Sequence, residues 1–340
     1  MELTKIFSTA FNAVAPIILL ILLGYFLRQK KFFSEDFVKI GNKLVFNVCL
    51  PCMLFVNVYE IEGFSSIQWD IVIYSVAVIA VIFVLGLAAS VAATPVPQRR
   101  GVLLQCAFRS NFAIIGLSLA AALGGEEAEA VAAVISAFTI PVFNILAVIS
   151  LSIFVGEEAG KKSFKSILMN IIKNPLIIGV VLGLLCVAYR SAQLTVYREV
   201  RFSLKTDMKF FYDCLTKLKA IASPFALLVL GGQFTFSAVK GMFKEIAVGT
   251  VFRLIIAPAI GIGGAILLTD WNVLSCGINE FPALIALFGS PVAVSSAVMA
   301  GAMHNDEQLA TQLVVWTSIC SVITIFLQVC LLMAAGLLAV

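Results

Sequence analysis

Residues 70–93 read DIVIYSVAVIAVIFVLGLAASVAA, an apolar run with no charged residue after Asp70. A helix needs about 20 apolar residues to cross the hydrocarbon core of a bilayer, so this stretch predicts a membrane-spanning helix. The rest of the chain has the same character, because 61% of its 340 residues are hydrophobic and only 12% are charged. Soluble domains carry about 25% charged residues. We therefore expect an all-α polytopic membrane protein, whose helices satisfy their own backbone hydrogen bonds in lipid.

Ten segments of the chain are long and apolar enough to be spans. We expect them near residues 6–27, 38–58, 70–93, 102–123, 130–155, 166–189, 210–238, 245–269, 280–303 and 308–338. No basic segment precedes the first span and no small-residue cleavage site follows it, so it is expected to be retained rather than cleaved as a signal peptide. Most of the eight cysteines lie inside these spans, where a thiol behaves as a small hydrophobic group rather than as part of a disulfide framework.

The charges of the loops predict how the chain is oriented. Basic residues such as Arg28, Arg99 and Lys161 gather in the loops after spans 1, 3, 5 and 7, whereas the loops after spans 2, 4 and 8 are acidic. Basic loops face the cytoplasm, so both termini are expected outside. The basic loop after span 6 and the acidic turn after span 9 do not follow this pattern. We expect the plasma membrane, specifically a bacterial inner membrane. The net charge of +4 lies in short loops and does not indicate nucleic-acid binding.

The two halves of the chain share short motifs in the same order. With five spans in each half, the halves enter the membrane from opposite sides, and such inverted repeats are typical of secondary carriers. The matching segments are 16–24 with 175–183, 50–54 with 223–227, and 124–127 with 304–307. The expected organisation is a first repeat at residues 1–157, a cytoplasmic linker at 158–165 and a second repeat at 166–340.

Spans 4 and 9 carry polar and helix-weakening residues in the middle of apolar segments. Span 4 reads RSNFAIIGLS at 109–118, and span 9 reads GSPVAVSSA at 289–297. If both helices unwind there, freed amides and half-helix N-termini face each other inside the bilayer and favour an anion. The candidate contacts to a carboxylate in these spans are Arg109, Ser110, Asn111, Ser290, Pro291, Ser295 and Ser296.

Each of these residues also has a simpler interpretation. Small polar residues commonly pack membrane helices together. We take Arg109 as the only basic residue well inside an expected span; it either has a function, as intramembrane charges usually do, or extends to the cytoplasmic face. Asn47 in span 2 and Asn144 in span 5 either face the site or bond to neighbouring helices. No aspartate or glutamate is expected at mid-membrane, so proton coupling through a central carboxylate is not indicated.

Several segments together resemble a known family. They are residues 108–111 leading to Gly116, 174–178, 223–227, 290–293 and the turn at 306–309. Over essentially the whole chain, they resemble the auxin efflux carrier family of prokaryotic permeases, distant relatives of the plant PIN-type auxin carriers. The resemblance implies ten transmembrane helices in two inverted five-helix repeats, with spans 4 and 9 broken where they cross at the substrate site. It implies that spans 1, 2, 6 and 7 form a scaffold against which the other spans move, and that members often form homodimers.

The resemblance also implies a substrate class and roles for individual residues. Asn111 matches the asparagine of the first crossover in the plant carriers, and Pro291 matches a proline at the start of the second. Ser118 and Ser296 stand where the plant carriers have the prolines that break these helices, so Ser118 joins the candidates. The implied function is secondary transport of small organic anions, carboxylates such as malate or auxin-like acids, by alternating access. No cofactor or metal is expected.

A second function class keeps the same fold. A non-transporting membrane sensor or lipid-binding scaffold is the alternative, and a regulatory soluble domain would favour it; the sequence shows none. A membrane enzyme would need a nucleophile with a base or a metal cluster, and one histidine without intramembrane carboxylates argues against it. The expected partners are a small organic anion, the lipid bilayer and a second copy of the chain, but not nucleic acid.

Overall fold

The computed structural model describes residues 15–16, 19–60, 68–155, 173, 175–234, 239 and 241–338. The side chains of a few helical positions, Ser118 among them, lie outside this description. Every regular element within the described residues is helical, and seven of the described helices are long and apolar enough to cross a membrane. The expectation of an all-α, multi-pass membrane protein is therefore confirmed. The expected linker at 158–165 lies outside the described residues.

The helices follow one another along the chain with short π-helical turns between some of them. An apolar helix covers Leu19–Gln29. It is followed by α2 (Glu35–Leu44), η1 (Val45–Cys49), α3 (Leu50–Tyr59), α4 (Trp69–Ala93), α5 (Pro97–Phe108), η2 (Phe112–Gly116), α6 (Leu117–Ile153), α8 (Pro175–Tyr197), α9 (Lys209–Gln233), α10 (Phe243–Val251), η4 (Phe252–Ile256), α11 (Ala257–Asp270), α12 (Glu280–Leu284), η5 (Ile285–Gly289), α13 (Ser295–Ala302) and α14 (Glu307–Ala334).

Local sequence explains where several helices begin and turn. Ser34 caps α2 by accepting a hydrogen bond from the backbone N–H of Phe37 at 3.0 Å, and Asp306 caps α14 by accepting one from Leu309 at 2.9 Å. Such caps satisfy donors that the first helical turn leaves free. Within α6, Gly125 has φ +70°, a conformation that glycine adopts without steric cost. The chain therefore turns at Gly125 from a short helical segment into the long apolar helix Glu127–Ile153.

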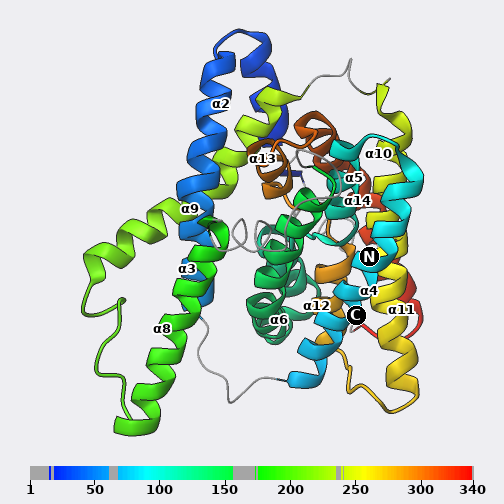
Figure 1. Ribbon diagram of the computed structural model, residues 1–340. Coiled ribbons are helices and arrows are strands. Elements are labelled where there is room, and N and C mark those ends of the chain that lie inside the picture. Colours follow the sequence, from blue (N-terminus) through cyan, green and yellow to red (C-terminus); the bar gives the residue numbers. More distant parts are fainter. Residues whose placement is uncertain are drawn as a thin grey trace.

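The helices form two groups that lie side by side (Figure 1). The first helix group contains α2, α3, α8 and α9, joined by contacts of α3 with α8 and α9 and of α2 with α9. The second helix group contains α4, α5, α10, α11 and α14, which also contact one another. Between them lie α6, α12 and α13, which pack mainly on the second group. Most of the buried apolar side chains form one continuous cluster that includes this intermediate layer.

Two glycines, one in the helix Leu19–Gln29 and one in α8, allow these helices to touch the first helix group through their backbones. A Cβ atom at Gly24 would collide with the carbonyl oxygen of Leu228 in α9. A Cβ atom at Gly183 in α8 would lie 3.0 Å from the carbonyl oxygen of Phe55 in α3 and 2.8 Å from Val58 Cβ. Small residues at such contacts let membrane helices approach closely, where dispersion forces hold them together. These contacts make the first helix group tightly packed.

Both of the polar segments expected in spans 4 and 9 are interrupted. The helix α5 ends at Phe108, and Arg109 is extended (φ −82°, ψ 102°) before η2 begins at Phe112. In the same way η5 ends at Gly289, Ser290 is extended (φ −65°, ψ 150°), and α13 begins at Ser295. Ser118 and Ser296, which the family resemblance matches to the crossover prolines of the plant carriers, lie inside α6 and α13. The breaks therefore occur upstream of both serines.

Candidate functional site

The two breaks meet each other inside the protein. Ser110 and Val292 form an antiparallel β-bridge. The backbone N–H of Asn111 donates to the Pro291 carbonyl oxygen at 2.8 Å, and that of Ala293 donates to the Arg109 carbonyl oxygen at 3.3 Å. Backbone N–H and C=O groups that lose their helical partners at the breaks are thus partly hydrogen-bonded to the other segment. Buried backbone groups need such partners because water cannot reach them. We call this contact, formed by residues 109–111 and 290–294, the helix crossing.

Proline explains why span 9 opens at the helix crossing. Pro291 has no N–H to continue a helix and disfavours the helical conformation of the residue before it, and Ser290 is extended accordingly. The next N–H, of Val292, donates to Thr317 Oγ1 of α14 at 3.2 Å. No proline stands at residues 109–111, where the extended backbone of span 4 is stabilised by its hydrogen bonds to span 9.

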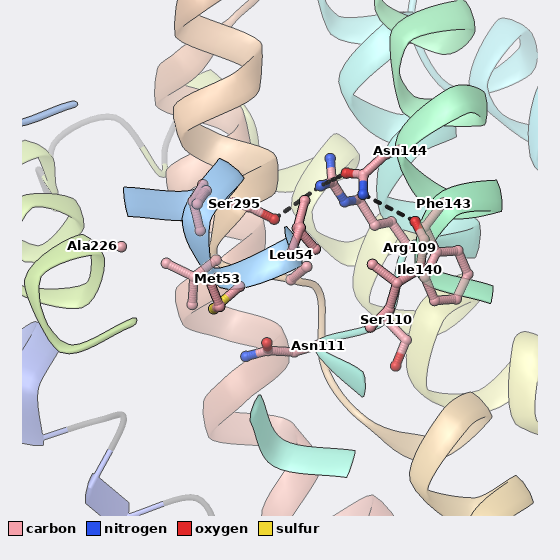
Figure 2. A pocket seen from close by; sticks show the side chains of 13 residues that line it. Met53, Leu54, Arg109, Ser110, Asn111, Ile140, Phe143, Asn144, Ala226 and Ser295 are labelled. Atoms are coloured by element: carbon pink, nitrogen blue, oxygen red, sulfur yellow. Dashed lines mark hydrogen bonds between the residues drawn. The ribbon is translucent and has the colours of Figure 1, made fainter. Parts of the chain in front are cut away.

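A small cavity lies beside the helix crossing, between the first helix group and the intermediate layer. Its volume is about 50 Å³, more than the 10–15 Å³ or so that one water needs. Its walls come from the crossing, α3, α6, α9 and α13, and Figure 2 shows the side chains that line it. The lining residues are Leu50, Met53, Leu54, Arg109, Ser110, Asn111, Ile140, Phe143, Asn144, Ala226, Ala293, Val294 and Ser295.

Arg109 brings a positive charge to the wall of this cavity. Its side chain is buried, with 4% of the residue exposed. Nη2 donates to Asn144 Oδ1 at 2.8 Å and to Ser295 Oγ at 3.0 Å (Figure 2), and Nη1 lies 3.0 Å from the Met299 sulfur. All three partners are neutral, and within the described part of the chain Arg109 has no carboxylate partner. The charge is therefore positioned but not neutralised.

Two neighbours of Arg109 add unused polar atoms. Asn111 Nδ2 and Ser110 Oγ are buried, and neither has a hydrogen-bond partner within the described residues. Buried polar atoms are almost always paired, so unpaired ones on a cavity wall indicate that a ligand or water completes them. The amide of Asn111 can only donate from Nδ2, which matches the acceptor oxygens of an anion.

The structure brings half of the sequence-predicted residues to the cavity. Arg109, Ser110, Asn111, Asn144 and Ser295 line it together. For Asn144, the sequence left open whether it faces the site; its side chain is 1% exposed and contacts Arg109 directly.

The other predicted residues lie elsewhere. Ser290 is buried and donates to the Ala286 carbonyl oxygen at 2.6 Å, while Pro291 contributes a carbonyl to the helix crossing. Ser296 is buried in α13 without lining the cavity. Asn47 is exposed, donates to the Lys43 carbonyl oxygen at 2.8 Å and borders a separate apolar cavity. Ser118 lies in α6, with its side chain outside the described residues.

The statement that Arg109 is the only basic residue well inside a span is wrong. Arg253 lies in η4, within the apolar helix Phe243–Asp270, and is 0% exposed. The sequence signal for Arg253 is its position inside an apolar span, about 15 Å of helix rise beyond Phe243. The long apolar run on both sides of Arg253 satisfied the hydropathy criterion and hid this single charge.

Comparisons with known proteins identify the family of this chain. A family model described as "Membrane transport protein" matches residues 9–329. The chain belongs to this family. The match confirms the resemblance to the auxin efflux carriers, because this is their family. A protein named an uncharacterized transporter in Methanocaldococcus jannaschii is 25% identical to this membrane transport protein over 253 residues, covering 73% of the chain and 76% of the relative. The uncharacterized transporter YfdV of Escherichia coli strain K12 is 25% identical over 309 residues, covering 87% of the chain and 89% of the relative.

The family is one of membrane transporters, and the apolar helices of the described residues fit a multi-pass membrane protein. Within the described residues, no group of three or more His, Cys, Asp or Glu side chains is arranged to hold a metal ion.

Proposed function

We propose that the protein is a secondary transporter of small organic anions, and that the cavity beside the helix crossing is its substrate site. One observation carries the proposal: Arg109, positioned by neutral partners, shares a buried cavity with the unpaired amide of Asn111. A buried guanidinium without a counter-charge is costly, and an anion entering the cavity supplies that charge.

A carboxylate suits the donors that surround the cavity. Arginine has five N–H donors, and the contacts described above use only part of this set. Guanidinium and carboxylate groups form strong, charge-assisted hydrogen bonds, and Asn111 Nδ2 offers a further donor. The apolar side chains of Leu54 and Phe143, which also line the cavity, suit the hydrocarbon part of an organic acid. The volume of about 50 Å³ favours small substrates in this conformation.

The proposal includes two inverted repeats of five spans, at residues 1–157 and 166–340, joined by a cytoplasmic linker at 158–165. Packing of the helix Leu19–Gln29 on α9 and of α8 on α3 supports it. When 16–24 is matched with 175–183 and 50–54 with 223–227, Gly24 corresponds to Gly183, and Leu228 corresponds to Phe55. Gly24 contacts the Leu228 carbonyl and Gly183 contacts the Phe55 carbonyl, so equivalent glycines make equivalent contacts.

Alternating access then has a defined geometry. The first helix group, with the helix Leu19–Gln29, acts as the scaffold, and the second helix group moves against it with the intermediate layer. The cavity supports this assignment because its walls come from both sides of that boundary. The proposal extends to a bacterial plasma membrane, external termini and a homodimer.

Thermal unfolding in detergent against a panel of carboxylates, amino acids, sugars and lipids tests the function. A carboxylate that binds the folded state raises the melting temperature, and Asn111→Ala should remove that rise and abolish uptake while leaving the protein folded. Ser75→Ala is the matched control, since Ser75 is also buried with an unpaired hydroxyl but lies in α4 away from the cavity. Wild-type uptake by Asn111→Ala would exclude the crossing as the site.

The alternative of a lipid-binding scaffold rests on the second cavity. It has a volume of about 590 Å³ and lies among α3, α8 and α9, lined mostly by apolar residues such as Phe55, Leu182 and Leu185. This volume suits an acyl chain. Stabilisation by lipids alone, with no response to carboxylates, would favour this function over transport.

A further inference from the structure

Arg253 is a buried charge that the proposed binding site does not use. It lies in η4, between α10 and α11, and is the largest side chain among the fully buried ones in the described residues. Within that part of the chain it has no carboxylate partner. A charge at this depth of a membrane protein needs an explanation, because its burial is costly unless it is fully hydrogen-bonded.

The partners of Arg253 are all main-chain carbonyl oxygens. Nε donates to Ser290 at 2.9 Å; Nη1 donates to Phe108 at 3.1 Å and Ala107 at 3.5 Å; Nη2 donates to Phe288 at 2.9 Å and Leu287 at 3.0 Å. These carbonyls belong to two segments far apart in the sequence, the end of α5 and the end of η5. One guanidinium thus joins both broken helices.

Helix ends explain why a cation is needed there. The last carbonyls of a helix have no intrahelical partner, and the C-terminus carries about half a negative charge. The ends of α5 and η5 both point these oxygens at Arg253. In the interior of a membrane protein, a cluster of carbonyl oxygens from half-helix C-termini is the chemistry that coordinates sodium ions. The guanidinium supplies the same positive charge through a covalently attached side chain.

We infer that Arg253 is a fixed internal cation that holds the two half-helix ends together, in the place where a bound metal cation would otherwise be required. Its role is to position other residues. Phe108 directly precedes Arg109, and Ser290 directly precedes Pro291, whose carbonyl accepts the hydrogen bond from Asn111. Arg253 therefore fixes the backbone on which the candidate ligand-binding side chains are mounted, and the crossing is assembled without a metal ion.

Chemical rescue of Arg253→Ala tests this inference. The variant should lose on the order of 10 °C in melting temperature, and about 10 mM guanidinium chloride should restore a large part of that loss by filling the vacated place. The same salt should not stabilise the wild type. Phe288→Ala is the matched control: Phe288 is equally buried and lies at the same helix end, so its loss creates a cavity but leaves Arg253 in place. Equal rescue of both variants, or rescue of neither, would overturn the inference.

A second pair of variants answers the case in which Arg253→Ala does not fold. Lysine and glutamine have similar lengths, but only lysine carries a charge, so Arg253→Lys should melt several degrees above Arg253→Gln. Equal melting temperatures would show that the charge is not what holds the helix ends. Replacing sodium by choline should leave the wild-type melting temperature unchanged, and a requirement for sodium would contradict the role of Arg253 as the resident cation.

These readouts remain informative if the proposed function fails. Melting temperatures need no substrate, so guanidinium rescue of Arg253→Ala can be measured even if the wild type transports no carboxylate. Conversely, uptake that survives in the wild type while rescue is absent would leave the transport proposal intact and remove only the inference about Arg253.

Discussion

Arg109 and Arg253 are two arginines buried in apolar surroundings, and they differ in the acceptors that their N–H groups contact. Both are buried, at 4% and 0% exposure. Arg253 is surrounded by main-chain carbonyls of two helix ends, whereas Arg109 meets neutral side chains at the edge of a cavity. The charge of Arg253 compensates the fixed dipoles of two helix ends. The charge of Arg109 has no such compensation and remains available to a ligand. Burial alone therefore does not separate a structural arginine from a binding arginine; the nature and fixity of the acceptors do.

The largest expected effect is on stability, at Arg253. Arg253→Met removes the donors from carbonyls that cannot reach water, and an unsatisfied buried group costs about 1–3 kcal/mol. Because several carbonyls lose their partner together, we expect a loss of at least about 3 kcal/mol in the free energy of unfolding. Urea unfolding in detergent measures it. If the free energy of unfolding fell by less than an average substitution costs, about 1 kcal/mol, Arg253 would not be the structural arginine of this comparison.

The next effect is on binding, at Arg109. Arg109→Gln should weaken carboxylate binding by about 10- to 100-fold, the value of one charged hydrogen bond, with little change in melting temperature. Calorimetric titration and uptake into proteoliposomes measure it. The control is Arg28→Gln, since Arg28 pairs with the exposed Glu35 far from the cavity. Unchanged affinity at Arg109 would mean that its charge only serves packing.

A smaller effect is expected at the residue that orients Arg109. Asn144→Leu keeps the approximate volume but removes the acceptor that Nη2 meets at 2.8 Å. The charge stays in the cavity while its direction is no longer fixed, so we expect a loss of carboxylate affinity of about 3- to 10-fold, as for one neutral hydrogen bond. Ligand titration of the variant beside Arg109→Gln measures it. A loss as large as that of Arg109→Gln would show that the two residues act as one unit.

The smallest effect is expected at a partly exposed ion pair, which sets the scale for the two buried charges. Lys219 Nζ and Glu60 Oε2 lie 2.9 Å apart, with side chains 30% and 38% exposed. Partial burial acts to raise the pKa of Glu60, but hydrogen bonds from Lys219 and Tyr212 outweigh it, so the pKa is lowered. Lys219→Met should cost no more than about 1 kcal/mol of stability.

The sign of the pH dependence at this pair follows from that shift. A carboxyl group whose folded-state pKa is lowered stabilises the protein above its unfolded pKa, and this stability is lost as the pH falls through the lowered value. The variant and the wild type should therefore differ at neutral pH and converge in acid. A difference that grows as the pH falls would contradict this assignment.

Much of the fold could be predicted because apolar runs of about 20 residues form membrane-spanning helices. The run at 70–93 became α4 (Trp69–Ala93), and the polar segments of spans 4 and 9 became the helix crossing. The positions of the breaks could not be predicted, because the pairing of Ser110 with Val292 joins residues far apart in the chain. The low helix propensity of Gly116 and Ser118 does not indicate that contact.

The candidate site was predictable in type but not in membership. Arg109 and Asn111 stood out as costly residues in apolar surroundings, and both line the cavity. Whether Asn47 or Asn144 faces that cavity depends on helix rotation, which packing against neighbours decides. Arg253 shows a different limit: its charge was visible in the sequence, but its acceptors are backbone atoms, which carry no sequence signal.

The β-bridge of the helix crossing has a consequence for how such proteins diverge. Its contacts join main-chain atoms of residues 109–111 to those of 291–293, so exchanging a side chain there deletes neither a donor nor an acceptor. Mutation can therefore alter the side chains that point into the cavity while the frame that presents them persists. Substrate preference can therefore change by single substitutions while the backbone structure of the site is conserved.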